Sequence, residues 1–149
     1  MHSPTARLDD SVTTPAAGEP LIVLGEKMTI KSAFPDGSWA VIEVEKNPDS
    51  KVPAHSHPWG EIYHIIAGGM RIMLAGQIYD APAGVCVHIP ADVVHQPLGP
   101  VQPGTRFLNI VGSVSAVELY RELAREVPPN RFDREKVVSI LTRHGVTLA

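Results

Sequence analysis

Three histidines and one glutamate have the residue types and the spacing of a metal site. His55 and His57 are two residues apart, so on a strand both imidazoles would point to the same face. A proline-containing turn follows, and Glu61 opens the next run of apolar residues, so the turn can bring its carboxylate back to the same side. His95 follows a second such turn. Three imidazoles and a carboxylate together suit one divalent metal ion, with Fe, Mn, Ni and Zn as candidates.

The number of ligands indicates what such an ion would do. Four protein ligands on an octahedral ion leave two positions for water, substrate or dioxygen, whereas a structural zinc site is usually closed. The pattern therefore predicts a catalytic metal held by His55, His57, Glu61 and His95. The alternative interpretation is a surface histidine pair beside a solvated glutamate.

Two neighbouring residues are further catalytic candidates beside Glu61. Strand alternation places Tyr63 on the same face as Glu61, and Ile62, His64 and Ile66 on the opposite face. His88 precedes the turn that leads to His95. If it points inward, it could be a fifth ligand or a proton carrier, and it could equally be a hydrogen-bonded wall residue.

A pocket around this ion would be mainly apolar. Its candidate wall residues are Trp59, Tyr63, Met73, Cys86, Phe107 and Asn109. Such a wall favours a small apolar or aromatic molecule as the substrate.

Short strands separated by turn residues must position these side chains. The expected strands are Leu21–Leu24, Met28–Ala33, Ser38–Glu45, Val52–His57, Glu61–Ala67, Met70–Leu74, Gln77–Asp80, Val85–Ile89, Val94–Leu98 and Thr105–Gly112. Their close spacing without intervening helices predicts an antiparallel sandwich or barrel. The preceding residues 1–20, rich in Ser, Thr, Pro and Ala, are expected to form a flexible arm.

The last third of the chain has helical periodicity. Ser115 and Glu118 form a capping-box pattern, and Ala116, Leu119, Tyr120, Leu123 and Val127 share one helical face. A second helix is expected between a cap at Asp133 and an end at Gly145. Both helices are expected to pack against the outside of the barrel. The predicted organisation is an arm at 1–20, a barrel at 21–112 and a helical extension at 113–149.

The metal-ligand region resembles the cupin family. The first cupin motif, G-x5-H-x-H-x3,4-E-x6-G, matches His55, His57, Glu61 and Gly68, with Asp49 in place of its leading Gly. The second, G-x5-P-x-G-x2-H-x3-N, matches Gly84, Pro90 and His95, with Asp92 and Gly99 in place of its inner Gly and terminal Asn. These departures affect turns rather than ligands. The resemblance extends from about Met28 to Gly112.

The resemblance implies a fold and a set of functions. The fold is an all-β double-stranded β-helix, or jelly-roll barrel, with the metal inside, usually built as a homodimer. The leading function is a quercetinase-like dioxygenase acting on an aromatic or enediol substrate. The alternatives are a non-redox polyketide cyclase or isomerase that uses the metal as a Lewis acid, and a non-catalytic cupin that binds a small ligand. Isoleucines on the outer face of the Glu61 strand would be covered by a second copy or by the helices.

Composition argues against other partners. The 149 residues include 13 basic and 16 acidic side chains, a net charge of −3, so neither nucleic acid nor a membrane surface is an expected partner. There is no apolar run of about 20 residues to span a bilayer. With no visible signal peptide and a single cysteine, a cytoplasmic location is expected.

Overall fold

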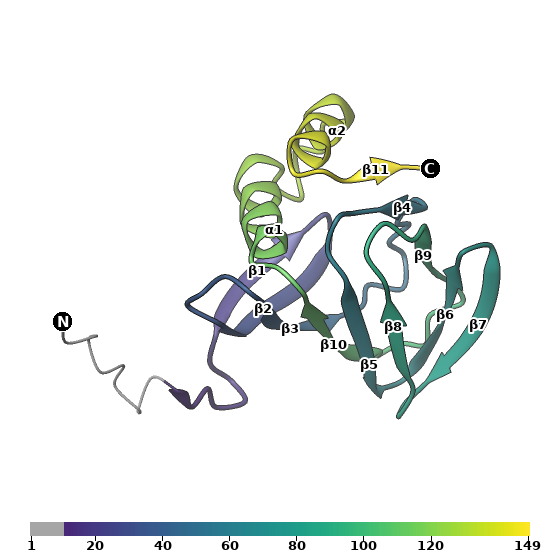
Figure 1. Cartoon of the computed structure of the whole chain (residues 1–149). Helices are drawn as coiled ribbons and strands as arrows, with labels where there is room; N and C mark the ends of the chain where they lie inside the picture. Colours follow the sequence, from purple (N-terminus) through teal and green to yellow (C-terminus); the bar gives the residue numbers. More distant parts are fainter. Residues whose placement is uncertain (1–10) are drawn as a thin grey trace.

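The computed structural model describes residues 11–149, which form two β-sheets and a pair of helices (Figure 1). The strands are β1 (Glu19–Val23), β2 (Glu26–Ala33), β3 (Ala40–Glu45), β4 (His55–Ser56), β5 (Glu61–Ala67), β6 (Gly69–Leu74), β7 (Gln77–Pro82), β8 (Cys86–Ile89), β9 (His95–Leu98), β10 (Arg106–Val111) and β11 (Thr147–Leu148). The helices are α1 (Ser115–Glu126) and α2 (Arg134–Arg143). Every expected strand has a counterpart, and β11 was not expected. Neither helix is long and apolar enough to cross a bilayer within the described part of the chain.

The chain alternates between the two sheets. One sheet has the order β1-β2-β3-β10-β5-β8 and the other has the order β11-β4-β9-β6-β7, and all pairings are antiparallel. From β3 onward the chain passes repeatedly from one sheet to the other, so residues far apart in sequence meet inside the barrel. This arrangement confirms the predicted all-β jelly-roll fold.

Register defines the inner face of the six-stranded sheet. Ile42 on β3 lies opposite Asn109 on β10, which in turn lies opposite Tyr63 on β5. Along β5, Glu61, Tyr63 and Ile65 are buried, and the residues between them are more exposed. The predicted alternation of β5 is therefore confirmed. Burying an isoleucine such as Ile65 stabilises the fold by about 1.5–3 kcal/mol relative to leaving it exposed.

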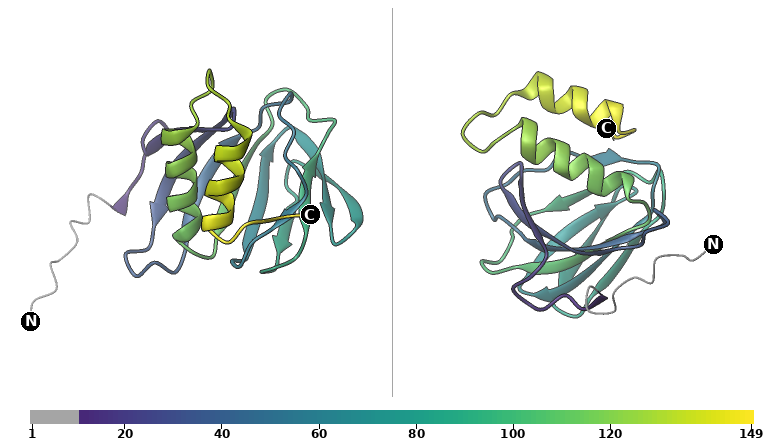
Figure 2. Two further views of the ribbon diagram at one scale, coloured as in Figure 1. Left: turned by 90° about the horizontal axis from the view of Figure 1, so that it is seen from above. Right: turned by 90° about the vertical axis from the view of Figure 1, so that its left-hand side faces the viewer.

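Helix α1 covers the inner side of the first sheet, not its outside, and α2 packs against α1. Leu119 and Leu123 of α1 line the same cavity as Met28 and Val44, which lie opposite each other on the inner faces of β2 and β3. Figure 2 shows both helices together on one side of the barrel. For α1, the expectation that the helices pack outside the barrel is wrong, because its apolar stripe covers the inner surface that β1, β2 and β3 present to it.

The helix ends agree only in part with the sequence patterns. At α1 the N-cap is Val114, which makes no side-chain cap bond, so the predicted capping box at Ser115 is wrong. The Ser113 hydroxyl accepts a hydrogen bond from the Ser115 N–H at 3.1 Å instead. At α2, the Asp133 carboxylate accepts from the Lys136 N–H at 3.1 Å, as expected. Gly145 follows the helix with φ +82°, a conformation that favours glycine.

Part of the expected arm is attached to the barrel. Residues 1–10 lie outside the described residues. In the remainder, the Thr13 hydroxyl donates to the Lys31 carbonyl at 2.8 Å. The Lys31 ammonium donates back to the carbonyl of Thr14 at 2.8 Å and to that of Ala17 at 2.7 Å. Residues 13–17 therefore lie against β2, because one lysine takes up several of their backbone acceptors.

Candidate metal centre

Three histidines meet inside the barrel. His55 on β4 pairs with His95 on β9, and His57 comes just after β4. One ring nitrogen from each of the three lies within 4.8 Å of those of the other two. The strand pairing thus brings together the three imidazoles that were predicted as metal ligands.

The second ring nitrogen of each histidine is held by the backbone. Nδ1 of His55 lies 2.8 Å from the Pro53 carbonyl, and the corresponding distances are 2.8 Å for His57 to Trp59 and 2.9 Å for His95 to Val93. A carbonyl oxygen only accepts, so each Nδ1 carries the hydrogen and each Nε2 of a neutral ring presents a lone pair. Metal-binding histidines are oriented in this way.

Glu61 lies beside two of these imidazoles. Its Oε1 is 3.1 Å from Nε2 of His57 and 3.0 Å from Nε2 of His95. It is not part of the mutual cluster that includes His55. Among the described residues, His95 Nε2 and the Glu61 Oε2 atom are buried without a hydrogen-bond partner. Converging lone pairs and an unsatisfied buried carboxylate oxygen fit a bound cation, since a cation would satisfy them together.

Glu61 is ionised in this environment. Burial alone would raise the pKa of its carboxyl group, but hydrogen bonding and the charges of His57 and His95 lower it to about 2. The pKa of His55 is lowered, mainly because burial disfavours its charged form. Burial acts in the same direction on His95, but hydrogen bonding to Glu61 raises the pKa of this ring overall. A divalent ion would displace the proton that Glu61 favours on His95, because the state that binds the ion is a negative carboxylate beside neutral imidazoles.

Trp59 fixes the orientation of His57. The two rings stack with centroids 4.4 Å apart and planes inclined by 10°. The same residue supplies the carbonyl that holds His57 Nδ1. Trp59 was predicted to lie in the pocket wall, but this stacking was not predicted, because it has no signature in the spacing of the motif.

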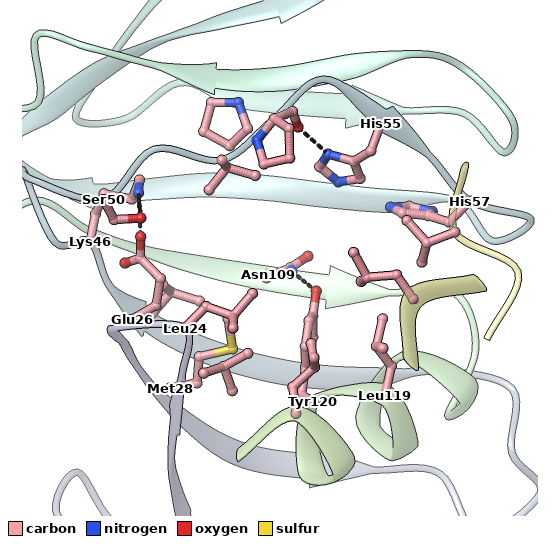
Figure 3. Close-up of a pocket in the computed structure, with 18 of the residues that line it drawn as sticks. Leu24, Glu26, Met28, Lys46, Ser50, His55, His57, Asn109, Leu119 and Tyr120 are labelled. Carbon is pink, nitrogen blue, oxygen red and sulfur yellow. Dashed lines mark hydrogen bonds and ion pairs between the residues drawn. The ribbon is translucent and has the colours of Figure 1, made fainter. Parts of the chain in front are cut away.

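A cavity of about 290 Å³ opens beside the cluster, and His55 and His57 are part of its wall (Figure 3). Of the predicted wall residues, Trp59, Tyr63, Phe107 and Asn109 line it, and Met73 and Cys86 do not. Cys86 is exposed. The helices add wall residues that were not predicted to line a pocket: Leu119, Tyr120, Leu123 and Leu141.

Two phenols belong to this wall, the buried Tyr63 and the partly buried Tyr120. Burial, reinforced by the negative charge of Glu61, raises the pKa of Tyr63 well above its usual value. The same two causes raise the pKa of Tyr120, whose hydroxyl accepts a hydrogen bond from Asn109 Nδ2 at 3.4 Å. Both phenols therefore stay protonated and can donate a hydrogen bond into the cavity.

His88 does not reach the site. It pairs with Ile62 on β5, whereas its neighbour Val87 pairs with Tyr63. Cross-strand partners share a face, so His88 lies on the face opposite to Tyr63 and Glu61, and it is exposed. The expectation that His88 points inward, as a ligand, a proton carrier or a wall residue, is wrong. An inward His88 would have to pair with Tyr63, but in the observed register of β8 its neighbour Val87 does so.

Comparisons with known proteins agree with the fold of the barrel. The family model of the cupin domain matches residues 42–111. A Thermotoga maritima structure described as a predicted oxalate decarboxylase aligns with TM-score 0.59 and 18% identity, covering 68% of this chain and 98% of that one. Pac13, a nucleoside dehydratase from Streptomyces, aligns with TM-score 0.53 and 14% identity, covering 68% of this chain and 81% of that one. The plu4264 protein of Photorhabdus luminescens aligns with TM-score 0.51 and 16% identity, covering 95% of this chain and 98% of that one. No curated protein matches the sequence.

Proposed function

Since this chain belongs to the cupin superfamily, we propose that it is a metal-dependent enzyme acting on a small, largely apolar molecule. One observation carries this proposal. The backbone holds Nδ1 of His55, His57 and His95, which leaves three Nε2 lone pairs converging beside a cavity. Such an arrangement is costly in a purely structural core, because converging lone pairs repel and lack donors.

The ligands in this proposal are the three histidines and Glu61. The imidazoles would bind through Nε2, and Glu61 would add the carboxylate and one negative charge. When bound, a divalent ion of this kind acts as a Lewis acid on an oxygen-containing group or supports oxygen chemistry at its open positions. The chain itself supplies orientation, a largely apolar wall that excludes water, and a protonated phenol at Tyr63 that can donate to a substrate oxygen.

The leading reaction is a quercetinase-like dioxygenation of an aromatic or enediol substrate. The wall favours a planar molecule, because Tyr63 and Phe107 present neighbouring rings with centroids 4.9 Å apart, and Trp59 lies beside the histidines. Aromatic walls of this kind stack with planar ligands.

The second candidate is a non-redox cyclase, isomerase or lyase. It is favoured by the two phenols that stay protonated in the cavity, since such chemistry needs a proton donor rather than an oxidant. Two proteins of similar fold are described as a nucleoside dehydratase and a predicted oxalate decarboxylase, reactions that do not insert oxygen.

Reconstitution separates these functions. The purified full-length chain would be loaded with Fe, Mn, Ni or Zn in turn and supplied with catechols, a flavonol and enediols in an oxygen electrode. Metal-dependent oxygen uptake by the parent but not by His57→Ala supports the dioxygenase. Turnover that persists without oxygen supports the second candidate. Metal binding without turnover of any compound would contradict both and leave a ligand-binding cupin.

A further inference from the structure

The two ends of the cavity differ in chemistry. His55 and His57 lie toward one end, and Glu26, Lys46 and Ser50 lie toward the other, with Asn109 and Tyr120 between them (Figure 3). Glu26 opens β2 and Lys46 follows β3, and their side chains are only 8% and 4% exposed. An ion pair is therefore built into the wall of a largely apolar cavity, away from the candidate metal centre.

The hydrogen bonds of this pair are unequal. Glu26 is fully engaged, since Oε1 contacts the Lys46 ammonium and Oε2 accepts from the Asn47 N–H at 2.8 Å. Lys46 also lies 3.3 Å from the Ser50 hydroxyl. An ammonium group has three donors, and the described residues provide acceptors for two of them. The carboxylate thus has a structural role, because it holds β2 to the chain that follows β3. The third N–H donor of Lys46 has no acceptor among the described residues and is not needed for this role.

The cavity wall at this end carries a net positive charge, and Asp49 of the same connection lies outside this wall, in the neighbouring hollow. The charged carboxylate and ammonium side chains that line the cavity are Glu26, Lys46 and Lys51, which leaves a surplus of one positive charge. Lys51 is exposed and belongs to the same connection between β3 and β4. A buried ammonium with a spare donor, supported by a second lysine, favours a negatively charged oxygen as its partner.

We propose that Lys46, with Ser50 and Lys51, binds a carboxylate of the substrate. This inference rests on the proposed function and specifies its substrate class. The substrate would carry an oxygen for the metal centre at one end, an apolar body in the middle and an acid at the other end. Lys46 is then a specificity-determining residue, since it would select acids over neutral molecules of the same shape.

The test uses a matched pair of probes, 4-phenylbutyrate and 4-phenylbutan-1-ol, which have the same apolar body. Their dissociation constants for the full-length protein are measured by isothermal titration calorimetry. We expect the acid to bind about tenfold more tightly than the alcohol, because a charge-assisted hydrogen bond to a buried ammonium favours the acid. This preference should disappear in Lys46→Met and persist in Lys27→Met, a lysine on β2 that does not line the cavity.

Two more variants keep the test decisive. Lys46→Met alone leaves Glu26 buried and unpaired, so the double variant Lys46→Met/Glu26→Gln repeats the measurement without a buried charge. His57→Ala shows whether the acid instead binds at the metal centre. A preference that survives in His57→Ala supports the proposal whether or not the chain turns over a substrate. Equal affinity for the two probes in the parent, retention of the preference without Lys46, or its loss only in His57→Ala would overturn it.

Discussion

His55 on β4 lies directly opposite His95 on β9, and their ring centroids are 4.4 Å apart. This single strand pair brings the two cupin motifs of the sequence together. Both rings donate from Nδ1 to the carbonyl two residues earlier, at Pro53 and Val93. The two motifs therefore orient their imidazoles by the same local hydrogen bond. The geometry of the candidate metal centre therefore depends on the backbone as much as on the histidines.

Glu61 should matter more for activity than for folding. Glu61→Gln preserves the shape of the buried side chain but removes its negative charge. We expect turnover to fall on the order of tenfold or more, because a neutral amide neither balances nor binds a divalent ion well. The midpoint of thermal unfolding should change little. Glu45→Gln, at an exposed position of β3, serves as the control, and an unchanged rate in Glu61→Gln would remove Glu61 from the mechanism.

The contact between β1 and α1 should depend on pH. Arg121 of α1 holds the Glu19 carboxylate with Nε–Oε2 and Nη2–Oε1 distances of 2.9 and 2.8 Å, and this hydrogen bonding lowers the pKa of Glu19 from 4.5. The stability it contributes is present above pH 4.5 and is lost as the pH falls through the lowered pKa. Both side chains are about two-fifths exposed, so we expect Glu19→Gln to cost at most about 1 kcal/mol at pH 7.

Urea unfolding of the parent and Glu19→Gln at pH 7 and pH 3 measures this effect. The difference in free energy of unfolding should shrink at the lower pH. A difference that is the same at both values would show that the pair does not contribute through its charge.

Leu123 should join the helical extension to the barrel. It is 2% exposed and lines the cavity from α1. Leu123→Ala should lower the free energy of unfolding by about 2–5 kcal/mol, because it removes buried methyl groups and leaves a void. Val138→Ala, at a position of α2 that is 38% exposed, is the control and should cost much less. Comparable losses in the two variants, measured by urea unfolding, would mean that α1 is not packed as described.

The outer face of β5 should mediate self-association. Ile66 is 37% exposed, and the helices lie on the other side of the sheet, so nothing among the described residues covers it fully. We expect a homodimer through this face and expect Ile66→Lys to shift it toward monomer, because a buried unpaired charge opposes association. Light scattering after size-exclusion chromatography decides this. A parent that is monomeric at micromolar concentration contradicts the expectation.

The sequence predicted most where its patterns are local and uninterrupted. The alternation from Glu61 to Ala67 runs between two turns, so both the bounds and the inner face of β5 were predicted correctly. His88 lies on a strand of only four residues, where a shift of one residue reverses the face and no long alternation fixes the register.

Long-range relations were harder to foresee. The apolar stripe of α1 predicted a buried face but not which surface it would meet, because β1 carries apolar residues on both faces, with Val23 buried and Ile22 exposed. The Lys46–Glu26 ion pair joins the first residue of β2 to the residue that follows β3. Nothing in the spacing of these two residues along the sequence predicts their contact. The residues of the candidate metal centre were predicted because they have the spacing of the cupin motifs, whereas the stacking of Trp59 on His57 arises only in three dimensions.

The metal content of purified protein tests the central claim most directly. Elemental analysis by mass spectrometry would compare the parent with His57→Ala and with His88→Ala, a histidine on the opposite face of the sheet. We predict close to one equivalent of a divalent transition metal per chain in the parent and in His88→Ala, and well below one in His57→Ala. Equal metal content in the parent and His57→Ala would contradict the assignment of the metal centre.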